Sequence, residues 1–275
     1  MSNVRFRWIV HRLSLELFGR SISLPEFPTQ KSITGIGLTD PKVIGDVLDA
    51  RFTYCNTYLT TAPQLDIRFD PSPIGELDFL IASEVFEHVE APVARAFDNA
   101  ARLLKSTGVF LLTVPWVWDG DVSTAIPKLY DWRLGREESG YVIINQKPDG
   151  QVERFSEMAF DGSPGPSFGY SREHFPELYD WRLSDIGEET ILLNTRPDGT
   201  VETFRNLVFH EGPGLALEMR LFTKGGIEDK LLGAGFEQIE FEMSDHPEFG
   251  IIFGHPWSRP VNARKQPKHQ TRRGR

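Results

Sequence analysis

The chain has 275 residues, of which 40% are apolar and 25% charged, as in ordinary globular proteins. This length allows one large domain, or one domain with an insertion. A formal net charge of −9 argues against a protein that binds nucleic acid. Cys55 is the only cysteine, which excludes an intramolecular disulfide and favours a reducing, cytoplasmic location.

The N-terminal segment is predicted to form an amphipathic helix over Val4–Phe18, with Phe6, Ile9, Leu13 and Leu17 on one side. Its arginine-rich face allows contact with a membrane surface, but packing on the rest of the domain is the preferred interpretation. Charged residues interrupt the apolar runs, so we expect neither a secretory signal nor stable membrane insertion. A proline-marked linker completes this region, residues 1–30.

Strands and helices then alternate. A short strand from Ile33 runs into a glycine turn, and Pro41 opens a helix for which Asp40 is the expected N-cap. A second strand is predicted over Phe52–Leu59, and a third, shorter one over Gln64–Phe69.

The stretch Gly75–Trp116 has the clearest strand–helix–strand pattern. Leu77–Ala82 is an apolar run of buried-strand length, a helix with one apolar face follows, and Gly108 is expected to end it. Val109–Val114 is almost continuously apolar, as in a strand covered on both faces. Such a unit implies a parallel sheet with a right-handed crossover, and ligands bind at the carboxyl ends of strands in such sheets.

An internal duplication follows. Leu129–Gly165 aligns with Leu178–Gly214 at an offset of 49 without a gap, and both copies contain LYDWRL and a later Pro-Asp-Gly. Pro-Asp-Gly is strong β-turn chemistry, with the glycine in the left-handed region. Each copy is therefore predicted to be a β-hairpin preceded by an aromatic anchor, and residues 126–214 form an insert.

The final part returns to the earlier pattern. We expect a short helix over Ile227–Leu232, a strand over Phe236–Met243 and a last strand over Gly250–Gly254. Seven Lys or Arg residues and no acid lie in Arg259–Arg275. Residues 257–275 are interpreted as a solvated basic tail, with a phosphate or membrane contact as the alternative.

Two segments resemble the class I S-adenosylmethionine (SAM)-dependent methyltransferases, of the type 11-like kind. They are LDFLIASEVFEHVEAPVARAFDNAARLLKSTGVFLLTVP, in which the SEVFEHV turn is the most specific part, and LLGAGFEQIEFEM. The resemblance implies an α/β fold with a doubly wound, mostly parallel, Rossmann-like sheet. Residues 31–125 and 215–256 would form this domain, with the duplicated β-hairpin region inserted between them.

The resemblance also implies SAM as the cofactor. The family's first motif has an acid and three alternating glycines; here Ile33 stands at the acid and Thr39 at the third glycine. Asn56 stands where the family has an acid that binds both ribose hydroxyls, and Asp66 at the position that contacts the adenine. The cofactor contacts expected from this alignment are Gly35, Gly37, Asn56, Asp66, Ile67, Ser83 and Glu84.

Two histidines are candidate catalytic bases. Glu84, Glu87 and His88 follow a buried strand, and they either contact the substrate or cap the following loop. His210 lies in the second copy of the repeat; His174, Glu218 and Arg220 are further candidates there, with an ordinary surface role as the alternative. Scattered histidines and one cysteine argue against a metal site.

The leading hypothesis is a SAM-dependent methyltransferase that acts on a small-molecule substrate. A non-catalytic relative that binds ligands is the second hypothesis, because the acids of the first two motifs are missing. A different nucleotide-binding Rossmann protein is the third, and the lack of a GxGxxG motif disfavours it.

Overall fold

A computed structural model describes residues 3–69, 71, 75–90, 92–117, 131–137, 140–146, 149–155, 178–187, 189–205, 207, 209–210, 216–217, 219, 222–254 and 259–265. The chain divides into two compact units. The sheet unit contains residues 1–89, 93–116 and 226–275, and the repeat unit contains residues 90–92 and 117–225. The helices within the described residues are α1 (Val4–Phe18), η1 (Leu24–Glu26), α2 (Lys42–Arg51), η2 (Phe86–His88), α3 (Ala94–Leu103), α5 (Lys224–Gly233) and η4 (Pro247–Phe249).

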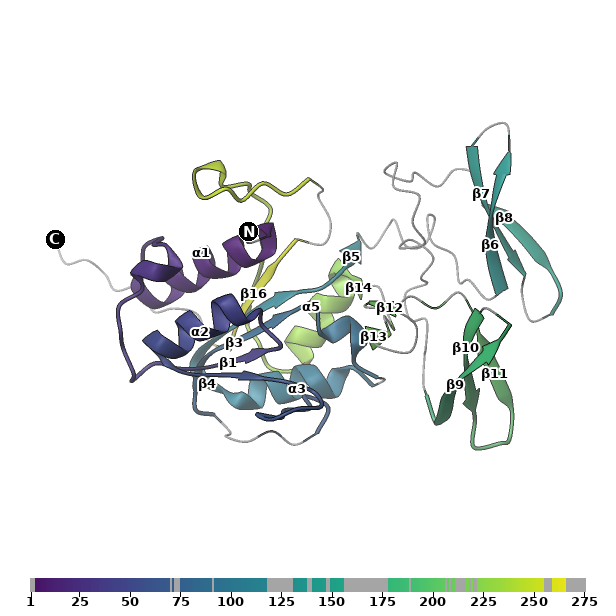
Figure 1. Ribbon diagram of the computed structural model, residues 1–275, viewed down its shortest axis with the longest axis horizontal. Coiled ribbons are helices and arrows are strands. Elements are labelled where there is room, and N and C mark those ends of the chain that lie inside the picture. Colours follow the sequence, from purple (N-terminus) through teal and green to yellow (C-terminus); the bar gives the residue numbers. More distant parts are fainter. Residues whose placement is uncertain are drawn as a thin grey trace. The chain divides into compact units, whose positions relative to one another are not determined.

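The sheet unit is built on six strands in the order β15-β16-β4-β3-β1-β2 (Figure 1). They are β1 (Thr34–Leu38), β2 (Thr53–Thr57), β3 (Leu77–Ser83), β4 (Leu104–Thr113), β15 (Gln238–Phe241) and β16 (Val261–Arg264). Three of the five strand pairs are parallel, and the two that involve β16 are antiparallel. This mostly parallel sheet with helices on both faces is the Rossmann-like α/β fold predicted from the sequence.

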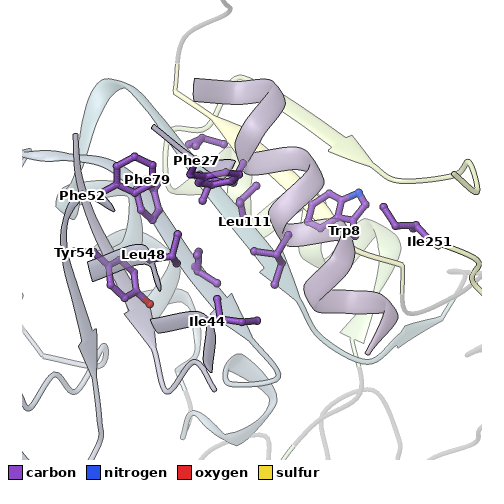
Figure 2. Packing of buried hydrophobic residues seen from close by; sticks show 13 residues of the cluster. Trp8, Phe27, Ile44, Leu48, Phe52, Tyr54, Phe79, Leu111 and Ile251 are labelled. Carbon is purple, nitrogen blue, oxygen red and sulfur yellow. The ribbon is translucent and has the colours of Figure 1, made fainter. Parts of the chain in front are cut away.

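The core follows from the alternation of side chains along buried strands. Phe79 and Leu111 point to the face that α1 and α2 cover, where they join one apolar cluster (Figure 2). Phe110 points to the opposite face, where it contacts Phe86, which in turn packs edge-on against Phe97 of α3. Both faces of the central strands are therefore covered, and the strands read as continuous apolar runs.

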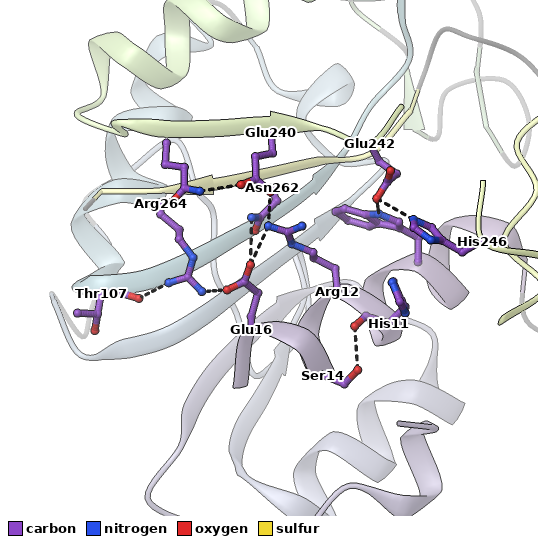
Figure 3. Close-up of polar contacts among 12 residues, drawn as sticks. His11, Arg12, Ser14, Glu16, Thr107, Glu240, Glu242, His246, Asn262 and Arg264 are labelled. Atoms are coloured by element: carbon purple, nitrogen blue, oxygen red, sulfur yellow. Dashed lines mark hydrogen bonds and ion pairs between the residues drawn. The ribbon is translucent and has the colours of Figure 1, made fainter. Parts of the chain in front are cut away.

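Helix α1 has the predicted bounds and packs on the sheet, as preferred over a membrane role. Its polar face is held by an ionic network that is buried at its centre (Figure 3). Glu16 forms ion pairs with Arg264 of β16 and with Arg12, and Arg12 also pairs with Glu240 of β15. The side chains of Glu16 and Arg264 are only 4% and 6% exposed. No described helix has both the length and the apolar character of a membrane span.

The prediction of a last strand at Gly250–Gly254 is wrong. In that segment Ile251 forms only an isolated bridge with His246. The strand is β16, which lies between β4 and β15 within the segment interpreted as a basic tail. Its four side chains are buried, and Glu16 neutralises its arginine, which is why a charged sequence forms an interior strand.

Gly108 does not end a helix. Helix α3 ends at Leu103, β4 begins at the next residue, and Gly108 lies within that strand. A Cβ atom at Gly108 would lie 2.8 Å from the carbonyl oxygen of Leu77, so close approach of two backbones explains the glycine. The third strand predicted over Gln64–Phe69 is also wrong, since only a bridge between Tyr58 and Gln64 continues the sheet there.

The repeat unit contains two similar antiparallel sheets of three strands each. Copy one has β6 (Asp131–Glu137), β7 (Gly140–Gln146) and β8 (Val152–Phe155), and copy two has β9 (Asp180–Ile186), β10 (Glu189–Thr195) and β11 (Val201–Phe204). The strand pairing is the same in the two copies, with residue numbers 49 higher in copy two. Trp132 pairs with Asn145 in copy one, and Trp181 pairs with Asn194 in copy two.

Gly150 and Gly199 both have φ of 84°, as predicted for the Pro-Asp-Gly turns. The LYDW segment is not a separate anchor, because Trp132 and Trp181 lie within the first strand of each sheet.

Copy two has a small apolar cluster around Leu192, and the indole Nε1 of Trp181 donates a hydrogen bond to Glu90 at 3.1 Å. Among the described residues there are four further short strands: β5 (Trp116–Val117), β12 (Phe209–His210), β13 (Ala216–Leu217) and β14 (Phe222–Thr223).

Candidate functional site

The carboxyl ends of β1 and β3 carry strained backbone. Leu38 pairs with Ala82, and just beyond this pair Thr39 and Glu84 have φ of 60° and 56°. Positive φ is uncommon outside glycine and is a genuine outlier for a β-branched residue such as threonine. Each residue is held there because its N–H donates to the next strand, to Thr57 O and Thr113 O respectively, both at 2.8 Å. Such strain gathers at binding and catalytic sites, which marks this edge as the candidate site.

Asp40 is a buried acid at this edge, and its pKa is raised. Its side chain is 4% exposed, and the Tyr54 hydroxyl donates a hydrogen bond of 2.6 Å to its Oδ2. Within the described residues its Oδ1 is buried and has no hydrogen-bond partner. Burial raises the pKa of Asp40 to about 7, although the Tyr54 hydrogen bond acts in the opposite direction. Asp40 is not the predicted N-cap of α2, which is Pro41.

Asn56, expected at the ribose, is engaged with the loop that follows β1. Its Nδ2 donates to the carbonyl of Asp40 at 2.7 Å, and the N–H of Asp40 donates to its Oδ1 at 2.8 Å. The amide also donates to the hydroxyl of Tyr58 at 3.2 Å. Asn56 therefore fixes the path of the loop, and this leaves little capacity for a ligand.

Gly35 and Gly37 lie within β1, not in a loop. A Cβ atom at Gly35 would lie 2.2 Å from the ring of Phe79, and one at Gly37 would lie 1.9 Å from the Tyr54 hydroxyl and 2.2 Å from Asp40. The space beside both glycines is thus filled by the protein's own side chains. Their small size serves internal packing and leaves no open cradle at these positions.

Asp66 and Ile67 lie in a loop beside the end of β2. Arg68 donates to both carboxylate oxygens of Asp66, at 2.6 to 3.0 Å. Burial alone would raise the pKa of Asp66, but the hydrogen bonds from Arg68 outweigh it and lower the pKa. Ile67 is buried, and Asn99 of α3 holds the loop by donating to the carbonyls of Ile67 and Phe69.

Ser83 and Glu84 stand at the end of β3, as predicted. The hydroxyl of Ser83 lies 2.8 Å from that of Thr113, which joins the ends of β3 and β4. Oε2 of Glu84 pairs with Arg5 of α1 at 3.2 Å, whereas its buried Oε1 has no hydrogen-bond partner in the described part of the chain. Arg5 was not singled out from the sequence, because nothing in the N-terminal helix pattern places it at this edge.

His88 is the last residue of η2. Its Nε2 lies 3.9 Å from Oε1 of the buried Glu87. Glu84 precedes the helical turn, so Glu84 and His88 do not lie on one regular helix. His210 is described by its backbone, which pairs with Ala216 in the repeat unit. His174, Glu218 and Arg220 lie outside the described residues. No group of metal-ligating residues is found among those described.

No protein-family model matches the sequence, and a search of curated proteins gives no match. Similar solved structures exist at low identity. The sugar N-methyltransferase KedS8 from Streptoalloteichus is 15% identical, with 94% of this chain and 87% of that chain covered and a TM-score of 0.44. A putative SAM-dependent methyltransferase from Listeria monocytogenes is 14% identical, with 88% and 94% covered and a TM-score of 0.42. DesVI from Streptomyces venezuelae is 12% identical, with 86% and 85% covered and a TM-score of 0.41.

Proposed function

We propose that this chain is a SAM-dependent methyltransferase that acts on a small molecule, in a reducing, cytoplasmic setting. One observation supports the proposal most. At the ends of the adjacent strands β1 and β3, Asp40 and Glu84 each keep a buried carboxylate oxygen without a hydrogen-bond partner among the described residues. A buried acceptor of this kind is costly unless a ligand or a proton satisfies it.

The acidic groups fit the cofactor better than the glycines do. SAM has two ribose hydroxyls and an ammonium group, which donate hydrogen bonds, and a sulfonium, which is positively charged. Carboxylates suit all of them. Asp40 and Glu84 would hold these groups, with Asp66, Ile67 and Ser83 as the further contacts expected from the sequence. Gly35, Gly37 and Asn56 would act on the site indirectly, through packing and the shape of the loop.

Bound SAM would supply the methyl group, and the protein's task is then mainly to align donor and acceptor. Thr39 and Glu84 fix the backbone at the edge, so the carboxylates are positioned before a ligand arrives. His88 and His210 stay proposed bases for an acceptor that must lose a proton.

Isothermal titration with S-adenosylhomocysteine (SAH) tests the proposal. The parent should bind in a saturable manner, and Asp40→Asn and Glu84→Gln should each weaken binding by roughly tenfold to a hundredfold, the loss of one hydrogen bond to a charged group. Asp46→Asn is the matched control, because it removes the same charge from an exposed position on α2. Equal affinities in all four proteins would remove both carboxylates from the site.

A non-catalytic binding module is the second candidate. The filled space at Gly35 and Gly37 and the engaged amide of Asn56 favour it, since these groups offer a cofactor little. SAH binding distinguishes the two candidate functions. If the chain is a non-catalytic binding module, the parent protein should bind neither SAM nor SAH.

A further inference from the structure

The sheet unit has a large cleft on the face covered by α1 and α2. Its volume is about 740 Å³, and its walls come from α1, from the segment around η1, from the first half of α2 and from η4. Cavities that hold small molecules commonly have volumes of roughly 300 to 1,000 Å³. The apolar side chains that line it include Phe6, Val10, Ile22, Val43, Val47 and Phe249.

Some of these apolar side chains are open to solvent. Val43 is 72% exposed and Phe249 is 42% exposed, although both face a concave surface. Covering such side chains removes apolar surface from water, which is favourable. The walls therefore favour an occupant that is itself largely apolar.

Six of the fifteen lining residues are polar or charged, among them Arg7, Glu26 and Glu248, and several of the six already have partners. Nδ1 of His11 lies 2.7 Å from the hydroxyl oxygen of Ser21, and the His11 ring packs against Phe249 and against His246. Glu26 accepts a hydrogen bond from Ser23 at 2.9 Å. A few placed polar groups in an apolar cleft are typical of small-molecule sites, where they orient the ligand.

One wall of the cleft, the first turn of α2, begins close to the candidate cofactor edge in the chain. Helix α2 starts two residues after Asp40, so Val43 in its first turn is near the carboxyl end of β1. Helix α1 reaches the carboxyl end of β3 through the ion pair of Arg5 with Glu84. The two helices that wall the cleft are thus the ones that meet the ends of the strands.

We propose that the cleft between α1 and α2 binds a largely apolar small molecule, and, resting on the proposed function, that this molecule is the methyl acceptor. A largely apolar acceptor narrows the substrate class, which the sequence alone leaves open.

The test uses the uncharged fluorescent probe N-phenyl-1-naphthylamine and the full-length protein. The parent should bind one equivalent of probe in a saturable manner. Val47→Trp, which fills the cleft, and Val43→Asp, which places a charge on its wall, should each weaken binding at least tenfold. Leu232→Asp is the matched control, because Leu232 is an apolar residue on α5, 53% exposed, that does not line the cleft; its affinity should stay within twofold of the parent.

Each remaining outcome decides a separate point. Equal probe affinity in the parent and in both cleft variants, with cooperative unfolding retained, would overturn the cleft proposal. So would loss of probe binding at protein concentrations where the chain dimerises, since a second copy would then cover the cleft. Saturating SAH should leave the probe bound. A parent that binds the probe but no SAH would refute the proposed function, and with it the acceptor assignment, while the small-molecule site would stand.

Discussion

Replacing Asp40 by asparagine should remove a pH-dependent loss of stability. The folded-state pKa of about 7 lies above the ordinary value of 3.8, so the folded protein keeps a proton that the unfolded chain releases. The stabilising contribution of this proton is fully present below about pH 4 and is lost as the pH rises toward 7. A difference of about three pKa units corresponds to on the order of 4 kcal/mol of unfolding free energy.

Urea unfolding of the parent and of Asp40→Asn between pH 4 and pH 8 measures this contribution. Asparagine has nearly the same size and cannot ionise, so other titrating groups cancel in the difference between the two proteins. Relative to the variant, the parent should lose stability as the pH rises, by a few kcal/mol in all. A difference that is constant with pH, or a parent that gains on the variant as the pH rises, would refute the assignment of a buried, proton-holding carboxyl.

Three further substitutions test the fold. Gly37→Ala should destabilise the sheet unit by about 1–3 kcal/mol in thermal unfolding, because its Cβ meets filled space, whereas Gly233→Ala, with open space around it in α5, should not. Gly199→Val should cost about 1–3 kcal/mol and lower the hydrogen-exchange protection of β10 and β11, because φ is 84° there; unchanged protection would contradict the turn. Arg264→Met should lower the unfolding free energy measured in urea by about 3–5 kcal/mol, because it leaves Glu16 buried without this partner. Lys42→Met, which breaks an exposed ion pair, should lower it by less than about 1 kcal/mol. Similar losses in the two variants would contradict the buried network.

Hydrophobic periodicity predicted the helices and strands in which one pattern of apolar side chains continues along the whole element. Helix α1 has its predicted bounds, and β3 differs from the predicted Leu77–Ala82 by one residue. The predictions for the last strand and for Gly108 were wrong because a contact with a residue distant in sequence determines the structure there. Nothing near β16 in the sequence shows that Glu16 neutralises Arg264, and nothing near Gly108 shows that the backbone of Leu77 approaches it.

The candidate site could be predicted only in outline. The strand–helix–strand pattern placed Glu84 at the carboxyl end of a buried strand, and Glu84 does follow β3 in the structure. Asp40 was predicted only as a helix cap, because an aspartate before a proline is typical of a helix N-terminus. Its burial beside Tyr54, 14 residues away, is not visible in the local sequence. The spacing of Gly35 and Gly37 by itself could not show that side chains of the protein fill the space beside them.

Hydrogen–deuterium exchange with and without saturating SAH tests the central claim most directly, namely that a SAM-type ligand binds at the carboxyl ends of β1 and β3. The account predicts slower exchange in the peptides that cover residues 36–42 and 81–88, with little change across α5 and β15. No change in either peptide at saturating SAH, or protection confined to other parts of the chain, would contradict it.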